Sequence, residues 1–269
     1  MHMKSTALAT FIIAQVLTAS TSHAIQEELQ TIATRPGVTQ PFLLIRPDRR
    51  PVASVILFAG GHGRLALSQR GIGWGRQNFL VRTRGLFAEQ GFLVAVADAP
   101  SDIGAEGLWH FRTSEAHALD IAGVIAFLRQ TANVPVWLIG TSAGTLSAAN
   151  AAARIRQGGV DGLALTSSIM RSSRVLPYAL TDVRLQDIAV PTLFVHHKDD
   201  LCSATPYEDI PVMMKKLTGA TRVELLTFTG GDLPHSEPCE ALSAHGFLGL
   251  EPAVVGAIST WIKATSSVQ

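Results

Sequence analysis

Charged side chains are scarce in this sequence, and those present are not gathered in runs. Asp, Glu, Lys and Arg together make up 16% of the 269 residues, and the formal net charge is +1. A balanced and dispersed charge does not provide the basic surface that nucleic acid requires, and it does not call for an ionic ligand. We therefore expect no nucleic-acid partner.

The sequence also lacks internal repeats, low-complexity segments and any stretch long enough for a large lid domain. The hydrophobic content of 47% is sufficient for one large buried core. We therefore predict a single globular domain over residues 25–269.

The first 24 residues have the pattern of a secretory signal. Lys4 gives a charged start, residues 7–17 are largely apolar, and a polar segment closes on Ala24. The apolar part is too short to span a bilayer, so the pattern predicts a signal peptide over residues 1–24. An N-terminal helix that simply packs or frays is the alternative. The signal predicts export to the periplasm or the outside, without membrane insertion once it is removed.

Only two cysteines are present, Cys202 and Cys239. In the oxidising compartment to which a signal peptide leads, an even pair without other partners predicts one disulfide. Closing the loop between them would stabilise the fold by roughly 3 to 4 kcal/mol in the chain-entropy model.

Short apolar runs alternate with segments of helical periodicity along the rest of the chain. Continuous apolar runs are typical of strands buried on both faces, and the alternation predicts a mostly parallel sheet with helices on both sides. The expected strands cover 40–45, 53–58, 93–97, 136–139, 162–166, 192–195 and 223–228. The expected helices cover 78–89, 113–130, 145–155 and 252–263.

The most informative motif is G-x-S-x-G at residues 140–144. It follows an expected strand and precedes a run of small helix-forming residues. A sharp strand-to-helix turn of this kind holds its serine in a strained conformation that exposes the hydroxyl, and the glycines leave room for close backbones. This context predicts that Ser142 is a nucleophile. The backbone N–H of Ala143, at the start of the helix, is the expected first donor to a developing oxyanion.

A glycine-rich bend, residues 60–63, follows the expected strand 53–58. The loop after an early buried strand is where a second oxyanion donor is expected. Gly61 is the predicted donor and His62 the next candidate, although the His62 side chain is assigned no catalytic role.

Two longer loops are expected to overhang the carboxyl ends of the strands, where such sheets bind ligands. They are residues 64–77, with Trp74, and residues 98–111, with Trp109. We interpret the two tryptophans as walls of a pocket, with scaffold roles as the alternative.

Two acids and two histidines are candidates for the groups that would activate the serine. Asp199 and Asp200 follow the next-to-last expected strand, and His235 and His245 follow the last. In a nucleophile-acid-base order the imidazole removes the serine proton and returns one to the leaving group, while the carboxylate fixes the tautomer. The residues alone leave both choices open.

A metal site is a second interpretation of the same region, because its side chains suit zinc. The candidate ligands are His196, His197, Asp199, Asp200, Cys202, His235 and Cys239. They lack a recognised ligand spacing, so we predict neither a metal nor another cofactor. Two further histidines, His110 and His117, are assigned structural roles.

With these motifs in this order, the chain resembles the α/β-hydrolase superfamily over nearly its whole length after the signal. It is most similar to small bacterial members of the dienelactone-hydrolase-like or esterase-like type. The resemblance implies an α/β-hydrolase fold with about eight strands and a minimal cap. An H-x-x-x-D turn counted from His196 favours Asp200 over Asp199 as the acid. The terminal histidine loop favours His245 over His235 as the base.

The resemblance therefore implies serine hydrolase chemistry with Ser142, Asp200 and His245 as the catalytic residues. Dienelactone hydrolases usually carry cysteine at the nucleophile, where this chain has serine, so their substrate is not inherited. Because no charged clamp is evident, we expect a hydrolase of small or medium, largely uncharged carboxylic esters. An amidase or peptidase with the same triad and a non-catalytic exported binding protein are the alternatives. A bond from Cys202 to Cys239 would join the loops of the acid and the base.

Overall fold

The computed structural model describes residues 26–155, 159–174 and 176–266. The predicted signal peptide, 1–24, lies outside these described residues, so its cleavage stays a prediction. Within the described part of the chain, no helix is both long and apolar enough to cross a membrane.

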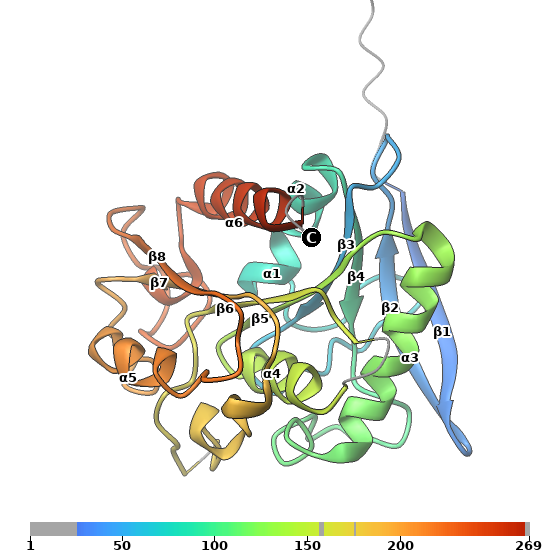
Figure 1. Ribbon diagram of the computed structural model, residues 1–269, viewed down its shortest axis with the longest axis horizontal. Coiled ribbons are helices and arrows are strands. Elements are labelled where there is room, and N and C mark those ends of the chain that lie inside the picture. The colour runs from blue at the N-terminus through green and yellow to red at the C-terminus, as the bar shows by residue number, and fades with distance from the viewer. Residues whose placement is uncertain (1–25, 156–158, 175, 267–269) are drawn as a thin grey trace, which may run out of the picture.

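One mixed sheet forms the centre of the molecule (Figure 1). Its eight strands are β1 (Glu27–Arg35), β2 (Val38–Ile45), β3 (Ala53–Phe58), β4 (Phe92–Ala97), β5 (Val136–Thr141), β6 (Gly162–Thr166), β7 (Thr192–His197) and β8 (Val223–Phe228). They are arranged in the order β1-β2-β4-β3-β5-β6-β7-β8. β2 is antiparallel to both of its neighbours, whereas β3 to β8 are parallel to one another. The predicted mostly parallel sheet is confirmed.

The central strands and the edge strand differ in burial. Every residue of β3, β4 and β5 is buried, as continuous apolar runs predict. β1 was not predicted. It pairs only with β2, and its residues are exposed or half-buried, so its sequence contains no continuous apolar run that would mark it as a strand.

Helices cover both faces of the sheet (Figure 1). They are α1 (Phe79–Arg82), α2 (Arg84–Glu89), α3 (Glu115–Ala132), α4 (Gly144–Arg154), α5 (Ile210–Met214) and α6 (Glu251–Ser266). α1, α2 and α6 pack with one hydrophobic cluster, and α3, α4 and α5 pack with the other. Short 3₁₀ helices occur at Leu180–Asp182, Leu185–Asp187, Tyr207–Asp209 and Ala244–Gly246.

The expected helix over 78–89 is two short helices. Thr83 separates them, with a backbone at φ −96° and ψ 3°. Its hydroxyl donates to the Phe79 carbonyl at 2.7 Å, which also accepts the Thr83 N–H at 3.1 Å. A side-chain bond of this kind to the carbonyl four residues earlier often bends a helix. α5, only five residues long and with proline in its first turn, was also not predicted.

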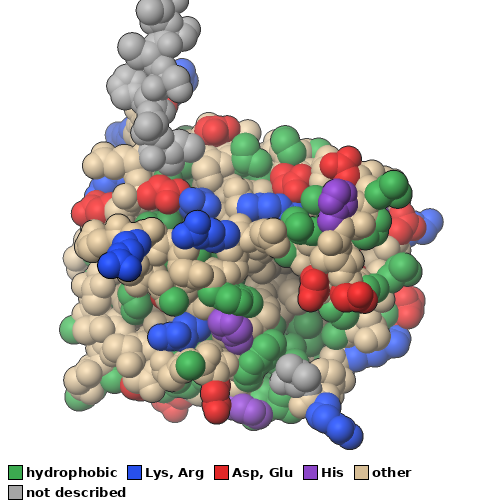
Figure 2. Space-filling view, turned by 180° about the vertical axis from the view of Figure 1, so that it is seen from behind, with side chains coloured by type: hydrophobic (Ala, Val, Ile, Leu, Met, Phe, Trp, Pro, Cys, Tyr) green, Lys and Arg blue, Asp and Glu red, His purple; other side chains and the backbone are tan. Residues whose placement is uncertain are grey.

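The parallel strands bring their carboxyl ends to one edge of the sheet, where folds of this kind bind ligands. The loops after β3, β5, β7 and β8 begin there and carry the predicted site residues. On the face in Figure 2, acidic and basic side chains both occur, in keeping with the dispersed charge of the sequence.

Candidate active site

Ser142 lies on the tight turn between β5 and α4. Its φ angle of 52° is left-handed, a conformation that non-glycine residues rarely adopt. The Ser142 N–H donates to the Thr166 carbonyl at 3.0 Å, which ties the turn to the end of β6. A Cβ atom at Gly140 would collide with the Gly144 backbone, and one at Gly144 would collide with the Phe58 carbonyl. The strain and the two glycines agree with the predicted nucleophile turn.

Asp200 and His245 form a buried hydrogen-bonded pair. His245 Nδ1 lies 2.9 Å from Asp200 Oδ2. The Cys202 N–H donates to Asp200 Oδ1 at 2.9 Å, and Thr205 Oγ1 donates to Oδ2 at 2.8 Å. Burial by itself would raise the pKa of the Asp200 carboxyl. The hydrogen bond and charge of His245, together with the hydrogen bonds from Cys202 and Thr205, outweigh burial and hold that pKa below its usual value. An ionised carboxylate on Nδ1 leaves Nε2 as the nitrogen that can accept a proton.

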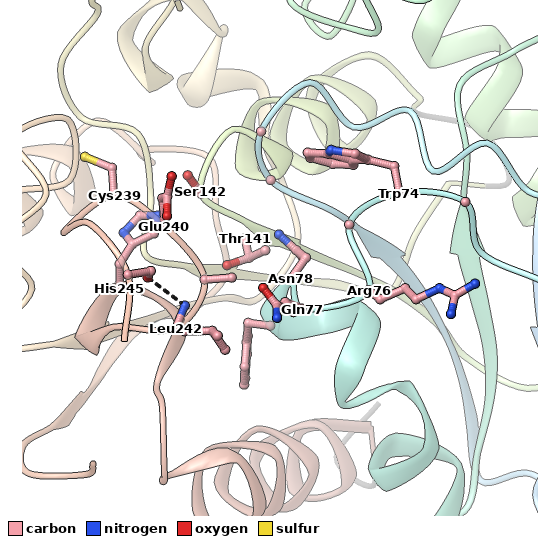
Figure 3. Close-up of a pocket in the computed structure, with 18 residues that line it drawn as sticks. Trp74, Arg76, Gln77, Asn78, Thr141, Ser142, Cys239, Glu240, Leu242 and His245 are labelled. Atoms are coloured by element: carbon pink, nitrogen blue, oxygen red, sulfur yellow. Dashed lines mark hydrogen bonds between the residues drawn. The ribbon is translucent and has the colours of Figure 1, made fainter. Parts of the chain in front are cut away.

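His245 and Ser142 line the same cavity of about 610 Å³ (Figure 3). His245 Nε2 is buried and makes no hydrogen bond with any residue that the structure describes. A base needs such a free nitrogen near the hydroxyl it deprotonates, and contacts of this kind commonly tighten only when substrate binds.

The structure brings one of the two histidines to this cavity, and one of the two acids into contact with that histidine. The Asp199 side chain is 68% exposed, and the Asp199 N–H donates to His197 Nδ1. His235 lies on an exposed stretch of the loop after β8, where its N–H donates to the Leu242 carbonyl. The favoured acid and base are therefore the pair that the fold places in contact.

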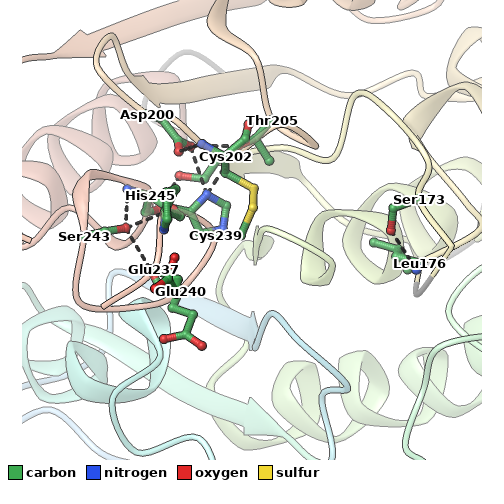
Figure 4. Close-up of a disulfide and its surroundings, with 12 residues drawn as sticks. Ser173, Leu176, Asp200, Cys202, Thr205, Glu237, Cys239, Glu240, Ser243 and His245 are labelled. Atoms are coloured by element: carbon green, nitrogen blue, oxygen red, sulfur yellow. Dashed lines mark hydrogen bonds and ion pairs between the residues drawn. A yellow bond between two sulfur atoms is a disulfide. The ribbon is translucent and has the colours of Figure 1, made fainter. Parts of the chain in front are cut away.

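A disulfide joins Cys202 to Cys239, as predicted (Figure 4). Cys202 follows Asp200 by two residues and Cys239 precedes His245 by six, so the bond links the acid loop to the base loop. The two cysteine sulfurs that were candidate metal ligands form this bond, so neither is a free thiolate. Among the described residues, no group of three or more His, Cys, Asp or Glu side chains is placed to hold a metal ion.

The glycine-rich loop after β3, residues 60–63, lies against Ser142. We refer to it as the oxyanion loop, because it carries the predicted donor Gly61. A Cβ atom added to Gly60 would lie 3.0 Å from Ser142 Cβ, and both Gly60 and Gly61 line the cavity. Gly61 has a φ angle of 59°, which suits glycine. The N–H groups of Gly61 and Ala143 stay predicted oxyanion donors, and the position of this loop beside the serine supports the first of them.

A buried arginine that the sequence analysis missed holds this loop. Arg112 is only 1% exposed. Its Nη2 donates to the carbonyls of Ala59 and Gly61, each at 3.0 Å, and its Nη1 donates to Ser147 Oγ on α4 at 2.8 Å. Burial lowers the pKa of the Arg112 guanidinium to about 9, so it is still charged at neutral pH. It connects the oxyanion loop to α4, the helix that follows Ser142.

Trp74 forms a wall of the cavity, as predicted. Its ring packs on that of His62 with centroids 3.7 Å apart, and a Cβ at Gly61 would lie 2.8 Å from Trp74 Cη2. Burial lowers the pKa of His62, and the charge of Arg112 adds to the effect. Trp109 instead packs against the hydrophobic cluster on the α3 and α4 side of the sheet, which is a scaffold role.

Two charged side chains, Arg76 and Glu240, also line the cavity, although the sequence suggested no charged clamp. Arg76 Nε donates to the Ile72 carbonyl at 2.7 Å. Figure 3 shows the Arg76 guanidinium directed away from Ser142. Glu240, in contrast, is drawn on the same side of the cavity as Ser142 and His245, so of the two charged side chains only Arg76 is directed away from the serine.

No protein-family model matches this sequence, and no curated protein matches it in sequence. Solved structures are nevertheless similar to it. An esterase of Pyrococcus furiosus is 12% identical with a TM-score of 0.64, over 89% of this chain and 91% of that one. A dienelactone hydrolase of Anabaena variabilis is 17% identical with a TM-score of 0.58, over 90% and 97%. An α/β serine hydrolase without a lid from Xanthomonas campestris is 14% identical with a TM-score of 0.57, over 90% and 94%.

Proposed function

Because the chain has the α/β-hydrolase fold, we propose that it is a serine hydrolase that cleaves carboxylic esters through an acyl-enzyme on Ser142. One observation carries the proposal. A serine in a strained, left-handed turn shares a cavity with a histidine whose Nδ1 is bound to the buried Asp200 carboxylate. The histidine and the carboxylate can activate a hydroxyl that is otherwise a weak nucleophile at neutral pH, and the turn exposes that hydroxyl to the cavity.

In the acylation step, Ser142 Oγ attacks the ester carbonyl carbon while His245 Nε2 accepts the hydroxyl proton. Asp200 stabilises the imidazolium that forms. The carbonyl oxygen becomes an oxyanion, which the N–H groups of Gly61 and Ala143 would stabilise. The C–O bond to the alcohol then breaks, and the imidazolium gives its proton to the departing oxygen. The acyl group remains as an ester on the serine.

Water completes the cycle by the same chemistry. His245 Nε2 accepts a proton from water as the water oxygen attacks the acyl carbon. The second tetrahedral intermediate collapses, the bond to Ser142 Oγ breaks, and the proton on the imidazolium returns to that oxygen. The products are the carboxylic acid, the alcohol and the free enzyme.

Small or medium, largely uncharged esters are the substrate class that the cavity favours. Its volume of about 610 Å³ lies in the range of sites for small molecules. Trp74, Phe79 and Leu242 contribute apolar surface to its lining, while the Arg76 guanidinium is directed away from the serine. The structural neighbours also include esterases.

Export of the chain is part of the proposal. A disulfide on the acid and base loops supports it, because disulfides persist in oxidising compartments. N-terminal sequencing of protein recovered from the periplasm or medium is expected to begin at Ile25. A mature N-terminus that retains residues 1–24 would refute cleavage without affecting the hydrolase proposal.

The deciding experiment labels the purified protein with a fluorophosphonate and locates the modified residue by mass spectrometry. We expect the label on Ser142 and hydrolysis of p-nitrophenyl butyrate. Ser142→Ala, with an unchanged circular dichroism spectrum, is expected to lose both. Hydrolysis by Ser142→Ala would refute the mechanism, and a folded wild type that neither reacts nor hydrolyses would favour the binding protein. Preference for the matched butyryl anilide would favour the amidase.

A further inference from the structure

Asn78 immediately precedes α1, but its side chain does not cap that helix. The backbone on either side of the side chain is fixed. The Asn78 N–H donates to the Gly75 carbonyl at 2.9 Å, and the Asn78 carbonyl accepts from the Arg82 N–H at 2.9 Å. The main chain therefore holds the residue in place while its carboxamide is available for another role.

The Asn78 carboxamide borders the space next to the nucleophile. Asn78 lines the active-site cavity, and Figure 3 shows it between Ser142 on one side and Arg76 on the other. A Cβ atom added to Gly60 would lie 3.2 Å from Asn78 Nδ2 and 3.0 Å from Ser142 Cβ. The amide nitrogen and the nucleophile therefore flank the same small volume.

The carboxamide has no partner in the part of the protein that the structure describes. Asn78 Oδ1 is buried and makes no hydrogen bond there, and Nδ2 likewise has no acceptor among the described residues. Leaving a buried polar group unpaired is unfavourable, because the group loses its hydrogen bonds to water without gaining others. Buried groups without partners are uncommon in native proteins, and a catalytic role is one of the explanations they call for.

Building on the serine hydrolase activity proposed above, we propose that Asn78 is a catalytic residue. Its Nδ2–H donates to the ester carbonyl oxygen as that oxygen becomes the tetrahedral oxyanion. Asn78 lies on the side of Gly60, next to the predicted donor Gly61, and Figure 3 places it on a different side of the cavity from His245. The developing oxyanion is therefore the reacting group it would meet, whereas the leaving alcohol must meet the base.

A carboxamide suits this task for two chemical reasons. It donates a hydrogen bond without transferring a proton, and it is neutral over the whole working range of pH. Because the backbone of Asn78 is fixed on both sides, the donor is preorganised and needs little movement during the reaction. The loss of one such donor typically lowers kcat by about 10²- to 10³-fold.

The test compares Asn78→Asp and Asn78→Ala with wild type in the hydrolysis of p-nitrophenyl butyrate. Asn78→Asp keeps the shape but replaces the donor by a carboxylate. We expect kcat to fall about 10²-fold or more in both variants, with KM changed by less than about threefold, which is the signature of an interaction made in the transition state. Gln90→Glu makes the same chemical change at an exposed amide at the end of α2 and is expected to retain the wild-type kcat.

A second measurement separates catalysis from folding. A boronic acid forms a tetrahedral adduct on a serine nucleophile, so its inhibition constant is expected to rise in parallel with the loss of kcat/KM. The inhibition constant of butyrate, which forms no adduct, is expected to stay the same. Urea unfolding at neutral pH verifies that each variant is folded under the assay conditions.

Three outcomes would overturn the role of Asn78. They are a wild-type kcat in Asn78→Asp, a change confined to KM, and equal losses of boronate and butyrate affinity. Any of these with an active, Ser142-labelled wild type refutes the Asn78 proposal alone. A wild type that is neither labelled nor active refutes the serine hydrolase proposal, and the role of Asn78 with it.

Discussion

The two halves of the candidate active site are held in place by different means. The acid and the base lie on two loops, and a disulfide between residues 37 apart in sequence joins these loops. The serine and the oxyanion loop have no covalent link. They are held by a two-residue turn, by glycines that allow backbone contact, and by the buried guanidinium of Arg112. The short turn at Ser142 is constrained by the strand before it and the helix after it. The two longer loops lack such constraints on both sides, and a disulfide joins them.

The end of β6 is where the two halves meet. The Thr166 carbonyl accepts a hydrogen bond from the Ser142 N–H at 3.0 Å. In the next residue, the Ser167 hydroxyl donates to the His245 carbonyl at 2.7 Å. Two adjacent residues at the end of β6 thus contact the candidate nucleophile and the candidate base. The variants below disturb one half at a time, so that the contributions of the two can be separated.

The largest effect is expected at the base. His245→Ala removes the only imidazole bound to Asp200 among the described residues, and kcat is expected to fall by about 10⁴-fold or more. Steady-state hydrolysis of p-nitrophenyl butyrate measures it. His235→Ala, on the exposed part of the same loop, is the matched control and is expected to be fully active. The reverse ranking of the two variants would move the base to His235.

A smaller but specific effect is expected at Arg112. Arg112→Met leaves the carbonyls of Ala59 and Gly61 without their donor, so the oxyanion loop should shift and kcat fall by about 10²-fold, with little change in KM. Arg129→Met is the control, because Arg129 also binds a carbonyl and Asp161 but lies away from the cavity. Equal kcat values for the two variants would show that the Arg112 contact is only structural.

Removal of the crosslink is expected to affect stability more than catalysis. The double variant Cys202→Ser with Cys239→Ser should lose about 4 kcal/mol of unfolding free energy, because its unfolded chain is no longer closed into a loop. The hydrogen bond from Thr205 to Asp200 is still available, so kcat at 25 °C should fall only severalfold. Urea unfolding and initial rates measure the two quantities. A fall in kcat as large as that of His245→Ala would mean that the disulfide itself aligns the acid and the base.

His117 lies outside both halves of the candidate active site, so a change there is expected to alter stability without altering catalysis. Burial first, and then the charges of Arg112 and Arg35, lower the pKa of His117 to about 3, whereas the unfolded chain titrates near 6.5. Between these values the unfolded state binds more protons, so stability falls as pH falls below about 6.5, by up to about 1.4 kcal/mol per pH unit for one histidine.

His117→Phe is therefore expected to flatten the pH dependence of stability while leaving kcat at pH 7.5 unchanged. The His117 ring lies edge-on to Phe58 and Phe111, and neither of its nitrogens has a partner among the described residues, so an apolar ring suits the site. Burial also lowers the pKa of His196 to about 3, so His196 is expected to retain part of the pH dependence of stability in this variant. Urea unfolding at pH 7.5 and 5 measures it, and an unchanged slope would contradict the buried neutral state of His117.

The elements that could be predicted from the sequence are those marked by residues that lie close together in the chain. β3, β4 and β5 are continuous apolar runs, and the Ser142 turn is marked by its own glycines, so both could be recognised without a structure. β1 could not, because an edge strand with exposed residues carries no such run. The break at Thr83 was missed because it depends on one side-chain hydrogen bond inside a helical pattern.

The supporting residues of the site could not be predicted for a different reason. Arg112 acts on carbonyls that lie 51 and 53 residues earlier in the chain, and no spacing rule connects them. Asn78 was interpreted as the first residue of a helix, and only the folded position of Gly60 relates it to the nucleophile. The choice of His245 over His235 rested on resemblance, and the contact with Asp200 now gives it a physical basis.

The left-handed backbone of Ser142 has a consequence for anyone who engineers this protein. A side chain at a φ angle of 52° is held against its own preference, at a cost of roughly 1–3 kcal/mol that a glycine would not incur. A library screened only for heat resistance would therefore enrich glycine at this position and yield more stable variants that lack the proposed nucleophile. Thermostability and turnover have to be selected together in this fold.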